Sequence, residues 1–101
     1  MMSDSADTIF AALEQELLTL TAVHEALRRE SAALSSGNVN DINAAIAAKN
    51  EVLQTHQAGM NRRPTRTVPE AVKADLQDLQ DRLAALAAQC QELNRRNGTL
   101  I

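Results

Sequence analysis

The chain is poor in the residues that build sheets, disulfide frameworks and ligand pockets. Its 101 residues include one phenylalanine, one cysteine, two prolines and three glycines, with no tryptophan or tyrosine. A single cysteine excludes an internal disulfide, and the shortage of aromatic and β-branched residues argues against a β-sandwich, a barrel or an α/β nucleotide-binding fold. Alanine and leucine are abundant instead, with 18 and 13 residues. This composition is typical of a helical protein with a single domain, residues 1–101.

Neither charge nor hydropathy indicates a nucleic acid or a membrane as partner. Ten basic and 13 acidic side chains give a formal net charge of −3, which is too mild to identify a partner and argues against a dedicated nucleic-acid binder. The first residues, Met1–Asp7, are polar and acidic, unlike a secretory signal peptide. No apolar run approaches the ~20 residues of a membrane span. We therefore expect a cytoplasmic protein.

Residues that alternate by three and four along the chain predict three helices. This spacing is that of a coiled-coil stripe, which packs on a neighbouring helix. The three stripes are, in order, Phe10, Leu13, Leu17, Leu20, His24, Leu27, Ser31 and Leu34; Val39, Ile42, Ile46, Lys49, Leu53, His56 and Met60; and Val72, Leu76, Leu79, Leu83, Leu86, Cys90, Leu93, Asn97 and Leu100. They predict helices at about 5–35, 39–58 and 69–97, with a linker at about 59–68.

The connections predict how these helices are arranged. Gly37 suits the left-handed position that ends a helix, and Asn38 is a good N-cap for the next one. A joint this short forces the first two helices into an antiparallel hairpin. The expected fold is all-α: an antiparallel helical hairpin plus a long third helix, together a three-helix coiled-coil-like bundle. The third stripe needs a partner helix, from the hairpin or from another chain, and we expect its C-terminal end to overhang the shorter hairpin.

No residue pattern supports catalysis or metal binding. His24 and His56 lie on stripes, and neither follows a glutamate by three residues, as ligand histidines of helical di-metal sites do. Cys90 lies on the third stripe, where a small buried side chain explains it. Phosphate-binding glycine loops and zinc-ligand spacings are absent from the sequence. We expect no enzyme activity, no metal and no cofactor.

A basic cluster in the linker, Arg62, Arg63 and Arg66, contains no acidic residue. It is a candidate contact for an acidic partner or a phosphate. Three charges without interleaved aromatic residues supply only a weak and salt-sensitive contact. A solvated linker explains the cluster as well.

Two stretches of the chain carry a more specific pattern. The first runs Glu30-x-x-x-Leu34-x-x-Gly37-Asn38-x-x-x-Ile42, then Ile46-x-x-Lys49-x-x-x-Leu53, and the second is Leu93-Asn94-x-x-Asn97-Gly98-x-Leu100-Ile101. Together they resemble the FlgN-type flagellar export chaperones. These are small cytosolic helical proteins that hold the hook-associated proteins before type III export. The resemblance covers about residues 9–101.

The resemblance implies a binding function and a set of residues for it. The client would be the amphipathic terminal helix of a hook-associated protein, paired with the third stripe in a helix-in-groove manner. The implied partner-binding residues are Leu86, Cys90, Leu93, Asn97 and Leu100. An export-gate component is a further implied partner. Family members commonly continue past the Asn-Gly motif with more helix and a C-terminal tyrosine, so client recognition by such a tail is not carried over to this chain.

Three other functions stay open at the level of sequence. A structural coiled-coil subunit would form homo-oligomers and ignore clients. A regulatory adaptor would use the arginine cluster, so replacing the three arginines would abolish its binding. A secretion chaperone of the injectisome type would differ only in its client, which the sequence does not distinguish.

Overall fold

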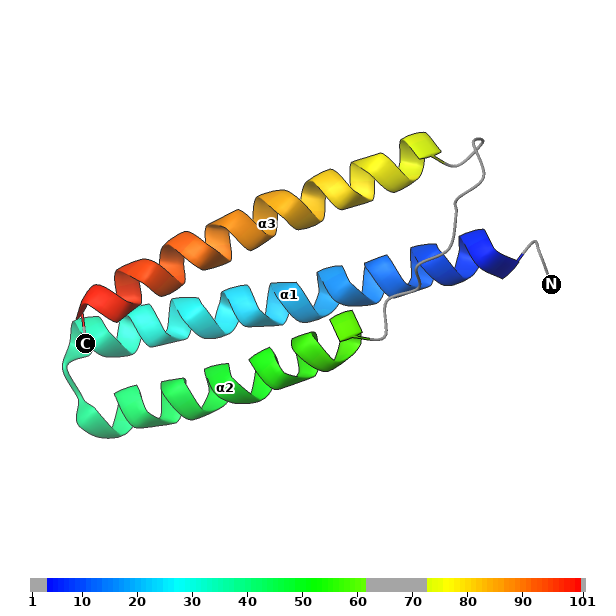
Figure 1. Cartoon of the computed structure of the whole chain (residues 1–101). Coiled ribbons are helices and arrows are strands. Elements are labelled where there is room, and N and C mark those ends of the chain that lie inside the picture. Colours follow the sequence, from blue (N-terminus) through cyan, green and yellow to red (C-terminus); the bar gives the residue numbers. More distant parts are fainter. Residues whose placement is uncertain (1–3, 62–72, 101) are drawn as a thin grey trace.

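The described part of the computed structural model, residues 4–61 and 73–100, forms three long helices (Figure 1). Their bounds are Asp4–Ser36 for α1, Val39–Asn61 for α2 and Lys73–Leu100 for α3. No strand occurs among these residues, and the helices pack on one another. The all-α helical bundle is thereby confirmed. It is elongated, with extents of 53 × 20 × 14 Å.

Two helices extend further than the stripes predicted. The stripes placed the ends at about 58 and 97, whereas α2 ends at Asn61 and α3 ends at Leu100. Gly59 and Gly98 therefore lie inside helices. An interior glycine costs only about 1 kcal/mol relative to alanine, so it weakens a helix without ending it. The remainder of the expected linker lies outside the described residues.

The turn between α1 and α2 forms as its residues predict. Gly37 has a φ of 72°, the left-handed conformation that glycine adopts without a steric penalty, and its N–H donates to the carbonyl of Ala33 at 3.1 Å. Asn38 then caps α2, because its side-chain oxygen accepts from the backbone N–H of Asp41 at 3.0 Å. The carboxylate of Asp41 lies in the first turn, where it interacts favourably with the helix dipole.

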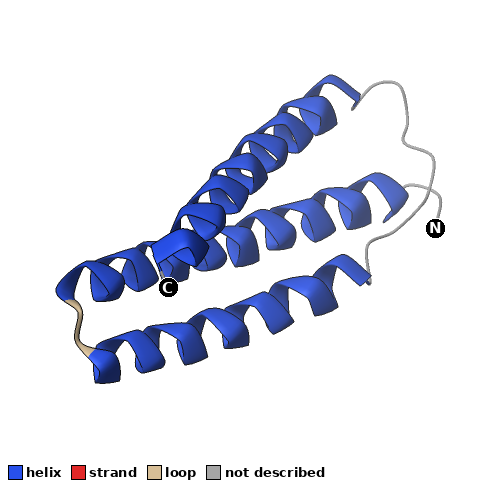
Figure 2. Cartoon of the chain, turned by 60° about the vertical axis from the view of Figure 1, so that its left-hand side comes forward, coloured by secondary structure: helices blue, strands red, loops and turns tan. Residues whose placement is uncertain are grey.

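α1 lies between the other two helices, as Figures 1 and 2 both show. α2 returns antiparallel to α1, so that Thr19 meets His56 and Glu30 meets Lys49. α3 runs parallel to α1 with a constant offset of 70 residues, since the Cys90 thiol lies against the carbonyl of Leu20 and the Asn97 amide against that of Leu27. Each outer helix packs on α1, while α2 and α3 barely contact each other.

The hydrophobic core lies mainly between α1 and α3. Its buried side chains are Ile9, Leu13, Leu20, Val23, Leu27, Leu76, Leu79, Leu83 and Cys90. Among the described residues of α2, no large apolar side chain is fully buried, and Val52 and Leu53 only pack against the edge of this core. The third stripe therefore has its partner inside the chain, and that partner is α1.

The buried line of α1 differs from the predicted stripe. Ile9 and Val23, which widen the stripe in the sequence, are buried, and so are Glu16 and Glu30. The stripe positions Phe10, Leu17, His24 and Ser31 are only half-buried. A helix with neighbours on two sides buries a wider face than a coiled-coil stripe does. The centre of that face is shifted by one residue, which brings two glutamates into it.

Candidate functional site

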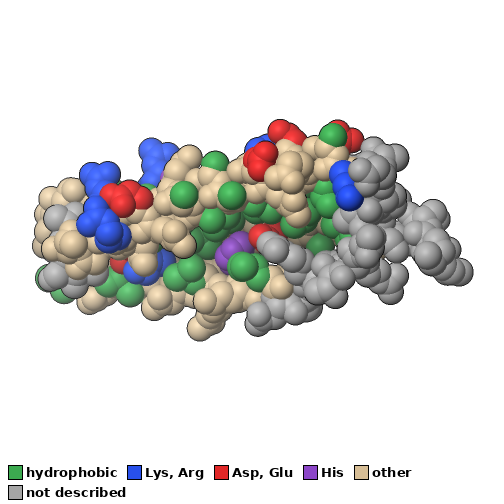
Figure 3. Space-filling model, turned by 45° about the horizontal axis from the view of Figure 1, so that its top comes forward, with side chains coloured by type: hydrophobic (Ala, Val, Ile, Leu, Met, Phe, Trp, Pro, Cys, Tyr) green, Lys and Arg blue, Asp and Glu red, His purple; other side chains and the backbone are tan. Residues whose placement is uncertain are grey.

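A groove runs between α2 and α3, with α1 as its floor. Figure 3 shows this face as a hollow in which hydrophobic side chains gather beside a histidine. The residues that line the groove are Leu20, Val23, Leu27, Leu53, His56, Ala87, Cys90, Gln91 and Asn94. None of them is an aspartate, glutamate, lysine or arginine. The groove is thus mainly apolar and carries no acidic or strongly basic group in its lining.

The groove exists because the two outer helices both pack on α1 and leave the space between them unfilled. Its volume is about 210 Å³, which is below the ~300–1,000 Å³ of ordinary small-molecule pockets. The space is therefore about the size of a few side chains and is bounded by residues of all three helices.

His56 forms part of the wall and is itself largely buried. Its Nδ1 atom lies 2.7 Å from the hydroxyl oxygen of Thr19, and this contact joins α2 to α1. The expected role of a histidine packed at the edge of a helix contact agrees with this position. Across residues 4–61 and 73–100 there is no cluster of three or more histidine, cysteine, aspartate or glutamate side chains that could hold a metal ion.

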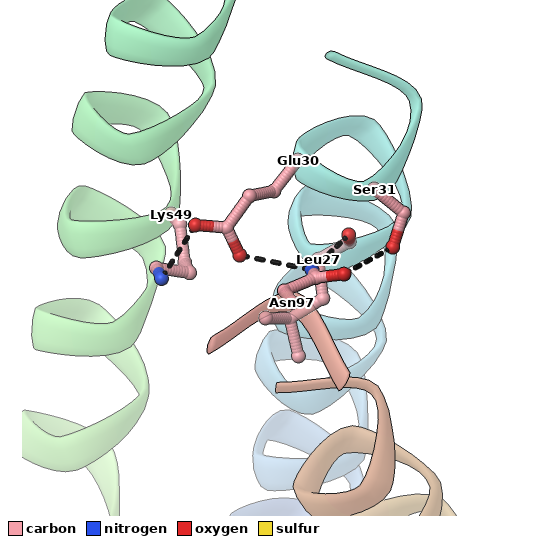
Figure 4. Close-up of polar contacts among 5 residues, drawn as sticks. All are labelled: Leu27, Glu30, Ser31, Lys49 and Asn97. Atoms are coloured by element: carbon pink, nitrogen blue, oxygen red, sulfur yellow. Dashed lines mark hydrogen bonds and ion pairs between the residues drawn. The ribbon is translucent and has the colours of Figure 1, made fainter. Parts of the chain in front are cut away.

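A polar layer, made of Glu30, Ser31, Lys49 and Asn97, ties all three helices together (Figure 4). The Glu30 carboxylate is completely buried; Lys49 Nζ donates to it at 2.8 Å and Asn97 Nδ2 at 2.9 Å. The second hydrogen of Asn97 Nδ2 goes to the carbonyl of Leu27 at 3.0 Å, and Asn97 Oδ1 accepts from the Ser31 hydroxyl. All hydrogen-bonding groups of the Asn97 side chain are therefore used within the chain.

This polar layer lies next to one end of the groove lining. On each helix it lies one turn beyond a lining residue: Glu30 follows Leu27, and Asn97 follows Asn94. On α2, which runs the other way, Lys49 precedes Leu53 by one turn. The apolar lining thus ends beside the layer in which the buried Glu30 and Asn97 meet the half-buried Lys49.

Four of the five predicted partner-binding residues lie on the face of α3 that packs on α1. Cys90 and Asn97 are buried there, and Leu86 and Leu93 are half-buried against the core. Cys90 also lines the groove, Leu93 lines a shallower depression on the other side of α3, and the side chain of Leu100 lies outside the described residues. Whether these residues bind a partner stays a prediction.

The expected overhang of α3 is wrong. The offset of 70 residues puts the end of α3, residue 100, beside residue 30 of α1. Since α1 continues to Ser36, the C-terminal end of α3 lies within the length of the hairpin. Burial of Asn97, which is 1% exposed, follows from this register.

The opposite side of α3 is more polar. The depression there is lined by His24, Ala88, Gln89, Glu92, Leu93 and Arg96. The hydrogen bond from Arg95 lowers the pKa of the exposed Glu92 carboxyl, and Glu92 raises the pKa of Arg95 in turn. An exposed pair of this kind contributes little to stability.

The predicted contact for an acidic partner, the cluster of Arg62, Arg63 and Arg66, lies outside the described residues. Among the helices that are described, none is long and apolar enough to cross a membrane. Sequence reasoning missed Glu30 as a buried group and missed Gln91 and Asn94 as groove residues. Glu30 falls on the three-and-four spacing of Val23 and Leu27, which is a signal that could have found it.

Cys90 provides a probe of how firmly α3 holds to α1. Burial raises the pKa of its thiol, so the thiolate, which is the reactive form, is scarce at neutral pH. The pKa of the Cys90 thiol is higher in the folded chain than in the unfolded chain. The buried thiol therefore favours the folded state below about pH 8.5, and this contribution is lost as the pH rises through the folded pKa. We expect iodoacetamide to label Cys90 at least about tenfold more slowly in the folded chain than in guanidinium chloride. Equal rates would mean that α3 is detached most of the time.

One comparison with known proteins gave a match. The family model described as FlgN protein matches the chain over residues 1–101. No curated protein and no solved structure matches it.

Proposed function

This chain belongs to the FlgN family of flagellar export chaperones, and we propose that it binds the amphipathic terminal helix of flagellar hook-associated proteins. The client helix would lie in the groove between α2 and α3 and complete a four-helix bundle. The chaperone would keep the apolar stripe of the client helix covered until export through the type III apparatus, and would so prevent early assembly of the client. The proposed site of action is the cytoplasm, and the mechanism needs no catalytic step.

The groove is the observation that supports this proposal most. It presents apolar side chains from three helices, and within residues 4–61 and 73–100 the two helices that flank it, α2 and α3, barely contact each other. An amphipathic helix uses such a groove by inserting a side chain at every third or fourth residue. Three or four large apolar side chains contribute on the order of 5–12 kcal/mol before the cost of ordering the partner. Affinity in the micromolar range is the expected net result.

The five predicted residues enter this proposal in two ways. Cys90 lines the groove and would contact the client. Leu86, Leu93 and Asn97 pack on α1 and would act by holding α3 in the position that forms the wall. Leu100 keeps its predicted role as a contact at the C-terminal end. An export-gate component remains a second proposed partner. Arg62, Arg63 and Arg66 keep their predicted role as a possible contact for an acidic partner.

Isothermal titration tests the proposal directly. The chain would be titrated with a synthetic C-terminal helical segment of a hook-associated protein, and with a flagellin segment as the control. We expect saturable one-to-one binding of the first segment with a negative heat-capacity change, because apolar surface is buried. Absence of binding would contradict the client assignment. If sedimentation shows that the chain self-associates and titration shows no client binding, the homo-oligomeric coiled-coil subunit is supported instead.

A further inference from the structure

The pair formed by α1 and α3 carries a second apolar surface, on the side opposite the groove. Its large apolar side chains are Phe10 and Leu17 on α1 and Leu86 and Leu93 on α3, and each is half-buried against the core. On each helix the two are seven residues apart and so lie on one side of it. His24 extends the α1 line by seven more residues and lines a depression there with Leu93. We call the surface formed by these five residues the back face.

Within residues 4–61 and 73–100, no other helix covers the back face. α2 packs on a different side of α1, where His56 meets Thr19, and it supplies no residue to the lining of the depression. A partner that completed the burial of the half-buried phenylalanine and leucines would gain the free energy of removing apolar surface from water. The back face is therefore a candidate interaction surface, and its charges indicate the partner.

The charges along the back face are divided between its two ends. On α3, Asp75, Arg82, Gln89 and Arg96 follow one another at intervals of seven residues, so they share one edge of the back face. Asp75 and Asp78 lie at the start of this edge, and Arg96 lies at its end, in the lining of the depression. Arg82, between them, already pairs with Asp78 at 4.0 Å. The edge thus begins with two exposed acids and ends with an exposed base.

α1 strengthens the basic end. The exposed Arg28 follows His24 by one turn, and the offset of 70 residues between α1 and α3 puts it at the level of residue 98, close to Arg96. An acid is also present there, Glu92, but its carboxylate is bound by Arg95 at 2.7 Å. A partner with charges of one sign would match only one end of the back face. A partner that fits both ends must be basic at one end and acidic at the other.

A second copy of this chain meets that requirement. If it is turned end over end about a two-fold axis, the basic end of each back face lies on the acidic end of the other. An axis at Leu17 pairs Phe10 with His24 of the second copy, since each is seven residues from Leu17. The offset of 70 residues puts residue 87 of α3 at the same level, nine residues from both Asp78 and Arg96. The same axis therefore pairs Asp78 with Arg96 of the second copy.

We propose that two copies of this chain associate through their back faces in this antiparallel arrangement. The edge from Asp75 to Arg96 is about 32 Å long, and two helices are about 20 Å wide, so each copy contributes about 600 Å². The total, about 1,200 Å², is at the lower end of specific interfaces, which is typical of a weak and reversible dimer. The groove lies on the other side of α3 and stays open in both copies, so this inference goes beyond the proposed function and does not depend on it.

Charge reversal at the paired ends tests the dimer. Arg96→Glu and Asp78→Arg each place like charges at both ends of the interface. In sedimentation velocity at about 1–500 µM, we expect the wild-type chain to dimerise with a Kd of about 10–100 µM and each variant alone to associate at least about tenfold more weakly. Mixing the two variants in equal amounts should restore wild-type association, because the mixed dimer again has opposite charges at both ends. Mixing would not repair a folding defect, and circular dichroism melting monitors the fold of each variant.

Arg95→Glu and Asp81→Arg are the matched controls, because they reverse the same charges at exposed positions of α3 that lie off the edge of the back face. Both should dimerise like the wild-type chain. A wild-type chain that stays monomeric over the whole range, or a mixture of Arg96→Glu and Asp78→Arg that fails to recover, would overturn the proposed dimer. Dimerisation of a chain that does not bind the client segment would contradict the proposed function alone.

Discussion

Replacing Lys49 with methionine is expected to lower the free energy of unfolding by about 3–5 kcal/mol. Methionine fills a similar volume but cannot donate to the Glu30 carboxylate, which is completely buried and accepts from Lys49 Nζ at 2.8 Å. The carboxylate would then retain only the amide of Asn97. A domain of this size has a total stability of about 5–15 kcal/mol, so the loss removes a large part of it. Urea denaturation followed by circular dichroism measures the change.

The double variant Glu30→Met with Lys49→Met separates the charge from the packing. When both members of a buried ion pair become apolar, the stability of the fold is typically regained or even increased. We expect the double variant to be more stable than Lys49→Met alone, with a small residual loss because Asn97 then lacks one acceptor. A double variant as unstable as the single one would show that the polar layer does not depend on this ion pair.

Replacing Ala87 with arginine is expected to weaken client binding by at least about 100-fold. Ala87 lines the groove and is half-buried beside the core, so a long side chain at this position extends into the space that the client would fill. Its charge can reach water in the free chain, and a bound apolar helix would bury it without a partner. Isothermal titration with the hook-associated segment gives the affinity, and thermal melting reports whether the fold is preserved.

Ala85→Arg is the matched control, because this alanine is exposed on the same helix and does not line the groove. It should bind the client like the wild-type chain. If Ala87→Arg lowers the melting temperature strongly, Gln91→Arg brings the same charge to the groove from an exposed position. Client binding that survives both groove variants would show that the client docks elsewhere on the molecule.

The sequence was sufficient to predict the helices, their order and the turn between the first two. Spacings of three and four residues are a local property, so Leu76, Leu79 and Leu83 could be assigned to a buried face before any contact was known. Gly37 and Asn38 acted as predicted because turn and capping chemistry depends on neighbours in sequence. Packing is what brought Glu16 and Glu30 into the buried face of α1 and left Leu17 and His24 half-buried.

The groove could not be predicted because it depends on a contact that does not form. Leu53 on α2 and Cys90 on α3 both belong to stripes that look complete in the sequence. Only the arrangement around α1 shows that these stripes meet on its two sides and leave a gap. Nothing in the sequence distinguishes Gln91 and Asn94 as groove residues, because exposed amide side chains are common on helix surfaces.

The polar layer also explains part of the resemblance that the sequence carries. Glu30 and Lys49 belong to the first of the two similar stretches, and Asn97 belongs to the second. These residues, far apart along the chain, meet in one hydrogen-bonded group. In this chain the two stretches are thus joined by hydrogen bonds that connect all three helices.

The parallel pairing of α1 and α3 has a consequence for the order of folding. Contacts between α1 and α2 close loops of 19 and 37 residues, whereas those between α1 and α3 join residues 70 apart. Contacts of shorter sequence separation form at a lower entropic cost. The α1–α2 hairpin should therefore assemble first during synthesis and α3 should dock afterwards, so the groove is completed only once α3 has been made.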